Sequence, residues 1–214
     1  MDHNSFIARE GWPFIILFGG LTVISALFGI GWLTGLLFIT AIFCTWFFRN
    51  PERSIPIDMN AVLSPADGKV IKIEEDFVSD EMAEGSFKKV SIFMNIFNVH
   101  VNRIPCSGKI AAIGYKKGKF LSANLDKASE LNEKNSVLIK MDDGRELLVV
   151  QIAGLIARRI VCWLTEGMLV KKGERFGLIR FGSRLEVFFP RDSRISVAVG
   201  DKVKAGESII GYLE

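Results

Sequence analysis

An uncharged stretch near the N-terminus, from Trp12 to Phe48, limits this chain to few possible architectures. Its 37 residues include no Asp, Glu, Lys or Arg. One helix needs only about 20 residues to cross a hydrocarbon core. Gly29-Ile30-Gly31 interrupts the stretch, and each half is then close to the lower length limit for a span. The sequence therefore predicts an N-terminal transmembrane α-helical hairpin over about residues 12–48, within a membrane anchor formed by residues 1–50.

Charged and aromatic residues at the ends of this stretch predict its orientation. Arg9 precedes it, while Arg49 and Arg53 follow it, so the positive-inside rule keeps both ends in the cytoplasm. Tryptophans also lie at the segment ends, where their rings favour the membrane interface. We expect a protein of the cell membrane with its soluble domain on the cytoplasmic face. A secretory signal peptide is the alternative, but its apolar region typically has about 7 to 15 residues, and no small-residue cleavage site follows here.

Residues 51–214 have the length of one ordinary soluble domain. The cysteines, Cys44, Cys106 and Cys162, are odd in number and widely spaced, which disfavours a disulfide framework and a structural zinc site. Residues 158–204 contain eleven Lys and Arg against five Asp and Glu. Such a stretch attracts anionic lipid or nucleic acid, although it can equally be a solvated surface. With the anchor in front, we expect the membrane as the partner and no nucleic acid.

Short runs of β-branched and aromatic residues recur between turn residues throughout this second part of the chain. They predict a mainly β fold, and the segment 121–133 is the one place with a weak helical pattern. The predicted strands cover residues 69–73, 88–95, 109–115, 137–141, 146–152, 176–181 and 185–189.

An internal repeat favours a barrel-sandwich-like arrangement of these strands. Residues 167–176 and 200–209 share the pattern Gly-x-x-Val-Lys-x-Gly-Glu-x-apolar, displaced by 33 positions. Each copy is expected to form a tight turn that feeds a strand, with glycine at a positive φ. The pattern is similar to that of biotinyl and lipoyl carrier domains. A carrier function would need a modified lysine in a hairpin tip, but the candidate, Lys140, lies within a predicted strand.

Three places offer side chains for chemistry, and each also has a purely structural interpretation. His100 is one of two histidines, and strand alternation puts it on one polar face with Asn98 and Asn102; a lone histidine is often structural. Asp67 lies in a Ser-Pro-x-Asp-Gly turn, where turn chemistry alone explains it. Gly182-Ser183 separates two apolar runs, as a simple β-kink would.

These elements follow a fixed order: the Ser-Pro-x-Asp-Gly turn, the Phe-x-Val-His-x-x-Arg-x-Pro segment from Phe97 to Pro105, and the Phe-Gly-Ser followed by the repeat. With the hairpin anchor in front, the combination resembles the phosphatidylserine decarboxylase family in its short form. The resemblance extends over nearly the whole chain, from the anchor through the segment 153–160 to Glu214.

The resemblance implies a proenzyme that cleaves itself without hydrolysis between Gly182 and Ser183, giving a large chain 1–182 and a small chain 183–214 that stay together as a heterodimer. It implies that Ser183 becomes a pyruvoyl group, which forms a Schiff base with the amine of phosphatidylserine and yields phosphatidylethanolamine and CO2. Neither a metal nor pyridoxal phosphate is expected. A higher oligomer remains possible. The alternatives are a pyruvoyl decarboxylase for another amino-acid substrate and a non-catalytic carrier or adaptor domain anchored to the membrane.

The resemblance also implies roles for individual residues. Asp67, a histidine and Ser183 form the arrangement for self-cleavage, and His100 matches the acid that protonates the product carbanion. Longer relatives carry His-x-x-His, whereas Arg103 takes the second place here, so either His100 or Asp67 with a water is the cleavage base. An arginine is not a base at neutral pH, and we expect Arg103 to bind the substrate carboxylate or phosphate. Arg158 and Arg159 are candidates for the lipid phosphate.

Overall fold

The computed structural model describes residues 5–78, 86–123, 128–155, 159–180 and 182–214. The chain divides into two compact units, Met1–Glu52 and Arg53–Glu214, and each is held together by its own contacts. The division falls close to residue 50, where the uncharged stretch gives way to a sequence of ordinary charge content.

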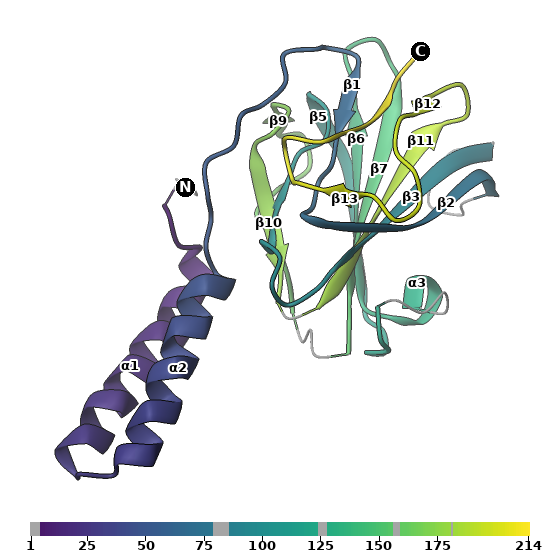
Figure 1. Ribbon diagram of the computed structural model, residues 1–214. Helices are drawn as coiled ribbons and strands as arrows, with labels where there is room; N and C mark the ends of the chain where they lie inside the picture. The colour runs from purple at the N-terminus through teal and green to yellow at the C-terminus, as the bar shows by residue number, and fades with distance from the viewer. Residues whose placement is uncertain (1–4, 79–85, 124–127, 156–158, 181) are drawn as a thin grey trace. The chain divides into compact units, whose positions relative to one another are not determined.

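The first unit is a pair of helices joined by a tight turn (Figure 1). A short 3-10 helix, η1 (Arg9–Gly11), leads into α1 (Trp12–Leu27), and α2 (Gly31–Phe47) returns beside it. Gly29 in the turn has a φ of +71°, a left-handed value that suits glycine. At the other end of the pair, the Ala8 N–H donates to the Phe48 carbonyl oxygen over 2.8 Å. The predicted helical hairpin is therefore present.

The outer surface of this hairpin is apolar. Arg9–Leu27 forms a helix of 19 residues that is long and apolar enough to cross a membrane, while Gly31–Phe47 is apolar but shorter. Large side chains such as Leu27 and Trp32 are 82% and 75% exposed. An exposed apolar surface of this kind is unfavourable in water and favourable in lipid. The N-terminal unit thus supports membrane association.

The second unit is built almost entirely of β-strands, which confirms the predicted mainly β fold. Among the described residues it has one short helix, α3 (Ala128–Leu131), so little of the predicted helical segment 121–133 is helical; residues 124–127 lie outside the described part. The strands are β1 (Ala61–Leu63), β2 (Gly68–Val78), β3 (Ser86–Met94), β4 (Val101–Arg103), β5 (Gly108–Lys116), β6 (Lys134–Lys140), β7 (Glu146–Ala153), β8 (Ile160–Cys162), β9 (Leu169–Val170), β10 (Arg175–Ile179), β11 (Ser183–Pro190), β12 (Arg194–Ile195), β13 (Lys202–Val203) and β14 (Ile209–Tyr212).

The described strands form one large curled sheet and two small sheets around a common core (Figure 1). The large sheet has the order β13-β2-β3-β11-β7-β6-β5-β9, and the small ones have the orders β1-β14-β12 and β4-β10-β8. Buried apolar side chains from all three sheets, including Val62, Ile92, Val149 and Ile179, belong to one hydrophobic cluster. This arrangement confirms the barrel-sandwich-like fold, with β11 in the interior of the large sheet.

The predicted repeat has the expected backbone geometry. Gly167 and Gly200, which open the two copies, have φ values of +84° and +107°. Gly173 and Gly206, in the turns, have φ values of +83° and +75°. The short strands of the copies, β9 and β13, are the two edge strands of the large sheet, and the strands that follow, β10 and β14, are the central strands of the two small sheets. The repeat therefore relates two halves of the domain.

A second, shorter repeat completes these halves. Residues 64–70 (Ser-Pro-Ala-Asp-Gly-Lys-Val) correspond to residues 104–110 (Ile-Pro-Cys-Ser-Gly-Lys-Ile). In one half, the Gly206 N–H donates to the Ser64 carbonyl oxygen over 2.9 Å, and in the other the Gly173 N–H donates to the Ile104 carbonyl oxygen over 2.8 Å. The same backbone bonds therefore join each short repeat to its copy of the longer one, and Asp67 and Ser107 become equivalent positions.

Candidate functional site

Gly182 and Ser183 form the corner between the small sheet β4-β10-β8 and the large sheet. Ser183 is the first residue of β11, where it pairs with Met94 of β3 and Ala153 of β7. Its side chain is fully buried. Gly182 has a φ of +69°, in the left-handed region that a residue with a Cβ rarely adopts. A serine hydroxyl is thus held away from water directly after a glycine in the left-handed conformation.

Buried polar side chains continue from Ser183 into the core, and the sequence did not single out most of them. The Ser183 Oγ donates to Met94 Sδ over 3.3 Å, and Asn102 Nδ2 donates to the same sulfur over 3.8 Å. Gln151 Nε2 donates to Asn102 Oδ1 over 2.8 Å, and Asn135 Nδ2 donates to Gln151 Oε1 over 2.9 Å. Sulfur is a weak acceptor, so the hydrogen bonds between the amide side chains are the strong part of this network. They fix the orientation of Asn102 beside Ser183.

His100 lies at the same end of the domain as Gly182. It immediately precedes β4, and its neighbour Val101 pairs with Leu178 of β10, the strand that leads to the corner. The histidine is 2% exposed. Its Nδ1 lies 2.9 Å from the Asn98 carbonyl oxygen, which can only accept, so Nδ1 carries the proton. In the neutral ring Nε2 then holds a lone pair, which suits a general base.

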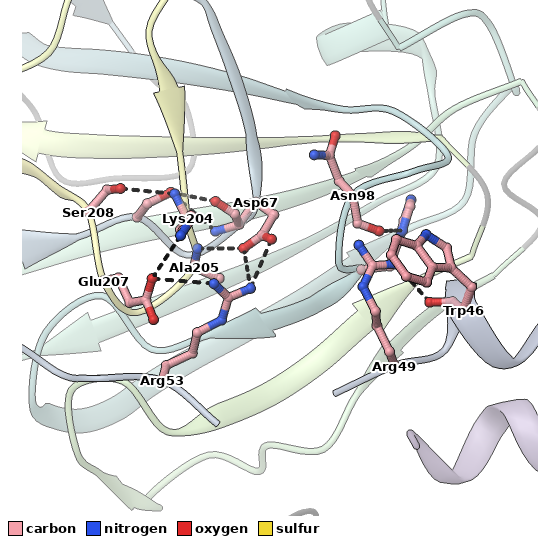
Figure 2. A network of polar contacts seen from close by, with 12 residues as sticks. Trp46, Arg49, Arg53, Asp67, Asn98, Lys204, Ala205, Glu207 and Ser208 are labelled. Atoms are coloured by element: carbon pink, nitrogen blue, oxygen red, sulfur yellow. Dashed lines mark hydrogen bonds and ion pairs between the residues drawn. The ribbon is translucent and has the colours of Figure 1, made fainter. Parts of the chain in front are cut away.

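Asp67 contacts the second copy of the repeat, residues 200–209, in the structure (Figure 2). Both of its carboxylate oxygens accept from Arg53 Nη2, at 3.0 and 2.9 Å, and Oδ1 also accepts from the Ala205 N–H at 2.8 Å. At the equivalent position in the other half, the Ser107 Oγ accepts from the Lys172 N–H over 2.9 Å. Arg53 also contacts Glu207 at 3.4 Å. These contacts give Asp67 a structural role, while its predicted part in catalysis stays a prediction.

Replacing Asp67 with serine tests its structural role. The hydroxyl can still cap the Ala205 N–H as Ser107 caps Lys172, but the buried pair with Arg53, whose side chains are 8% and 12% exposed, is lost. We expect the free energy of unfolding to fall by roughly 3 kcal/mol, because the buried Arg53 loses its nearer carboxylate and keeps only the contact to Glu207 at 3.4 Å. Urea unfolding of the uncut chain carrying Ser183→Ala, with and without Asp67→Ser, measures this loss. An unchanged midpoint would contradict it.

The arginines predicted to bind substrate have different surroundings. Arg103 is 5% exposed, and its Nη1 donates to the Gly173 carbonyl oxygen over 2.7 Å. A Cβ on Gly206 would lie 2.8 Å from its Cδ, so Arg103 packs against the turns of both repeat copies. Arg159 is exposed, and Arg158 lies outside the described residues. The structure therefore gives Arg103 a packing role, and substrate binding by these arginines stays a prediction.

Not all of the basic stretch from residue 158 to 204 is a solvated surface. Arg184 is 1% exposed and forms an ion pair with Glu186 at 2.8 Å.

Burial raises the pKa of the Cys106 thiol to about 12, and it also raises the pKa of Cys162. These thiols therefore remain protonated and are poor nucleophiles. Within the described part of the chain, no group of three or more His, Cys, Asp and Glu side chains is arranged to hold a metal ion.

Comparisons with known proteins identify the family of this chain. The sequence model of the family described as phosphatidylserine decarboxylase matches residues 40–211. A phosphatidylserine decarboxylase proenzyme of Syntrophus aciditrophicus is 60% identical over 213 residues, covering 99% of each chain. Proteins of the same name from Desulfotalea psychrophila and Rickettsia akari are 48% and 50% identical, covering 97% and 98% of this chain and 96% and 91% of their own. The chain therefore belongs to the phosphatidylserine decarboxylase family of enzymes.

Proposed function

We propose that this protein converts phosphatidylserine to phosphatidylethanolamine and CO2, with a pyruvoyl group made by self-cleavage between Gly182 and Ser183. The observation that carries the proposal is the position of Ser183, a fully buried hydroxyl that follows a left-handed glycine at the head of β11. The name proenzyme, which its relatives carry, supports a chain that is cut before it acts.

Self-cleavage begins with attack of the Ser183 Oγ on the carbonyl carbon of Gly182. Gly182 has no Cβ, so the approach to its carbonyl is open on that side. A base must take the hydroxyl proton as the new C–O bond forms. His100 is our candidate, because its Nδ1 proton is used by the Asn98 carbonyl and its Nε2 can accept. β-Elimination from the resulting ester would release the Gly182 carboxylate and leave a dehydroalanine at position 183. Addition of water to this group, with loss of ammonia, would then give the pyruvoyl group.

The surroundings of Ser183 fit the group that would be made from it. That group would stay attached to β11, next to Met94 and the oriented amide of Asn102. A pyruvoyl ketone supplies an electron sink for decarboxylation of an amine-bearing substrate. His100 then has a second task, which is to deliver a proton to the carbon that has lost CO2. Ser183, Asn102 and His100 are buried, so water is kept from taking the His100 proton before the substrate carbon does.

The two products of cleavage are expected to remain together. The small chain 183–214 would contain β11, which lies between β3 and β7 of the large chain, together with β12, β13 and β14. Its side chains Leu185, Val187 and Phe189 are fully buried in the common core. Separating the chains would expose this apolar surface to water. We therefore propose a heterodimer of large and small chains as the mature form.

The hairpin would place this domain at its lipid substrate. The apolar outer surface of α1 and α2 supports insertion in the cell membrane, and the arginines on both sides of the stretch favour a cytoplasmic domain. The substrate can then enter from the bilayer that holds the enzyme. A soluble amino acid would need no such anchor.

The substrate is tested by supplying the full-length protein in detergent micelles with phosphatidylserine or with free serine. We expect CO2 and phosphatidylethanolamine from the lipid and no CO2 from serine. Equal release from free serine would overturn the lipid assignment and favour a decarboxylase for another amino-acid substrate. A chain that stays whole and releases no CO2 from either compound would favour the carrier or adaptor alternative.

A further inference from the structure

We propose that the backbone N–H of Gly154 is the oxyanion donor for self-cleavage. The Gly154 N–H donates to the carbonyl oxygen of Gly182 over 3.1 Å. This is the oxygen that would take the negative charge when the Ser183 Oγ attacks. The inference rests on the proposed self-cleavage and adds to it the residue that directly follows β7.

The position of Gly154 follows from the strand register. Ala153, the last residue of β7, pairs with Ser183, the first residue of β11, so the next residue of one strand faces the preceding residue of the other. The hydrogen bond from Gly154 to Gly182 is thus set by the ladder that also holds Ser183. It is in place before the reaction, and a preorganised donor needs no rearrangement when charge develops.

The approach of the two backbones requires glycine at position 154. An added Cβ would lie 2.2 Å from the Gly182 carbonyl oxygen and 3.1 Å from its carbon, both backbone atoms that cannot turn aside. Any other residue would push the scissile carbonyl away from the donor. Gly154 is therefore demanded by the contact with the reacting group.

The reaction step balances as an N-to-O acyl shift. The Ser183 Oγ forms a bond to the Gly182 carbon, its proton goes to the base, and the carbonyl electron pair moves to the oxygen that faces Gly154. When the tetrahedral intermediate collapses, the carbon–nitrogen bond to Ser183 breaks and the nitrogen takes a proton. The product is an ester between Gly182 and the Ser183 Oγ. In the tetrahedral intermediate the Gly182 oxygen carries a full negative charge, whereas in the resting carbonyl it carries a partial one. The hydrogen bond from the Gly154 N–H would therefore be stronger in the intermediate and would stabilise it.

The sharpest test removes the N–H without adding a side chain. The full chain is made by cell-free translation into detergent micelles, with glycolic acid in place of Gly154, so that an ester replaces the amide. The matched control carries glycolic acid at Gly167, whose N–H donates to the Ile110 carbonyl oxygen over 2.8 Å in a turn of the repeat. Both chains lose one backbone hydrogen bond. Cleavage of the protease-resistant fraction is followed by intact mass.

We expect the chain altered at Gly154 to cleave about 10²-fold more slowly than the chain altered at Gly167, which is the size of effect seen when one oxyanion donor is removed. Equal cleavage rates would overturn the inference. If the unaltered chain stays whole in the same translation, the proposed function fails first, so the two failures are distinguishable.

Conventional variants give an independent check. Gly154→Ala puts a methyl group against the Gly182 oxygen, and Gly108→Ala creates a similar conflict with the Lys140 carbonyl oxygen, at 2.5 Å, in a strand pair remote from Ser183. We expect Gly154→Ala to cleave more than 10-fold more slowly than Gly108→Ala. Equal cleavage rates for the two variants would contradict the assignment.

Discussion

Replacing Ser183 with alanine is expected to leave one uncut chain of close to 23.9 kDa with no decarboxylase activity. Alanine cannot supply the oxygen that attacks the Gly182 carbonyl, and no pyruvoyl group can be made from it. The wild-type protein should instead give two fragments, 1–182 and 183–214. The smaller should be blocked at its N-terminus and lighter by one ammonia than a fragment that begins with serine. Intact-mass measurement of both purified proteins decides the matter.

Ser193→Ala is the matched control for this experiment. Ser193 is also buried, at 2% exposed, and lies in the same predicted fragment, but in the segment before β12. Its variant should be cut and active like the wild type. An uncut Ser193→Ala chain would show that loss of a buried hydroxyl impairs cleavage through folding. Two fragments from Ser183→Ala would end the proposed mechanism.

Replacing His100 with glutamine should slow both halves of the reaction. Glutamine keeps a polar side chain of similar length but can neither accept the hydroxyl proton of Ser183 nor return a proton to the product carbon. General acid–base catalysis by a positioned side chain contributes about 10²- to 10⁴-fold. We expect losses in this range, both in the cleavage rate followed by intact mass and in kcat measured per cut chain.

The two rates separate the roles of His100. If only kcat falls, His100 is the product acid, and Asp67 with a water becomes the candidate base for cleavage. If neither rate falls, His100 is a structural residue that packs at the start of β4. His3→Gln serves as the control because it removes the other histidine of the chain, and it should leave both rates unchanged.

Much of the fold could be predicted from local patterns. An uncharged stretch of 37 residues has few solutions other than a membrane hairpin, and the glycine pair at Gly29 and Gly31 marks its turn. The repeat was visible because glycine at Gly173 and Gly206 is required by positive φ values of +83° and +75°. These features depend on residues close together in sequence.

Contacts across the sheets could not be predicted in the same way. Met94, Gln151 and Asn135 lie on separate strands, and their meeting near Ser183 depends on the register of those strands. A shift of one residue would turn each side chain to the opposite face. Among the buried side chains near Ser183, the one local signal was the polar alternation that predicted Asn102 and His100 on the same face of a strand.

The structural role of Asp67 was hidden for a related reason. Its partners Arg53 and Ala205 are 14 and 138 positions away. The short repeat that makes Asp67 equivalent to Ser107 is only seven residues long and shares three identities at Pro, Gly and Lys. The pattern alone is too common to indicate a duplication, and the matching backbone hydrogen bonds reveal it.

The interior position of β11 in the large sheet also affects how the molecule refolds after unfolding. Before cleavage, this strand is covalently joined to its neighbours, so folding is a first-order process that does not depend on dilution. After the proposed cut at Gly182, the same strand must be recaptured from solution, and refolding becomes second order in protein. The large chain alone would expose two open edges at β3 and β7, which invite pairing with foreign strands. The stability of the uncut chain would thus be set by a reversible folding equilibrium. The stability of the mature protein would instead be largely kinetic, because it would depend on slow unfolding.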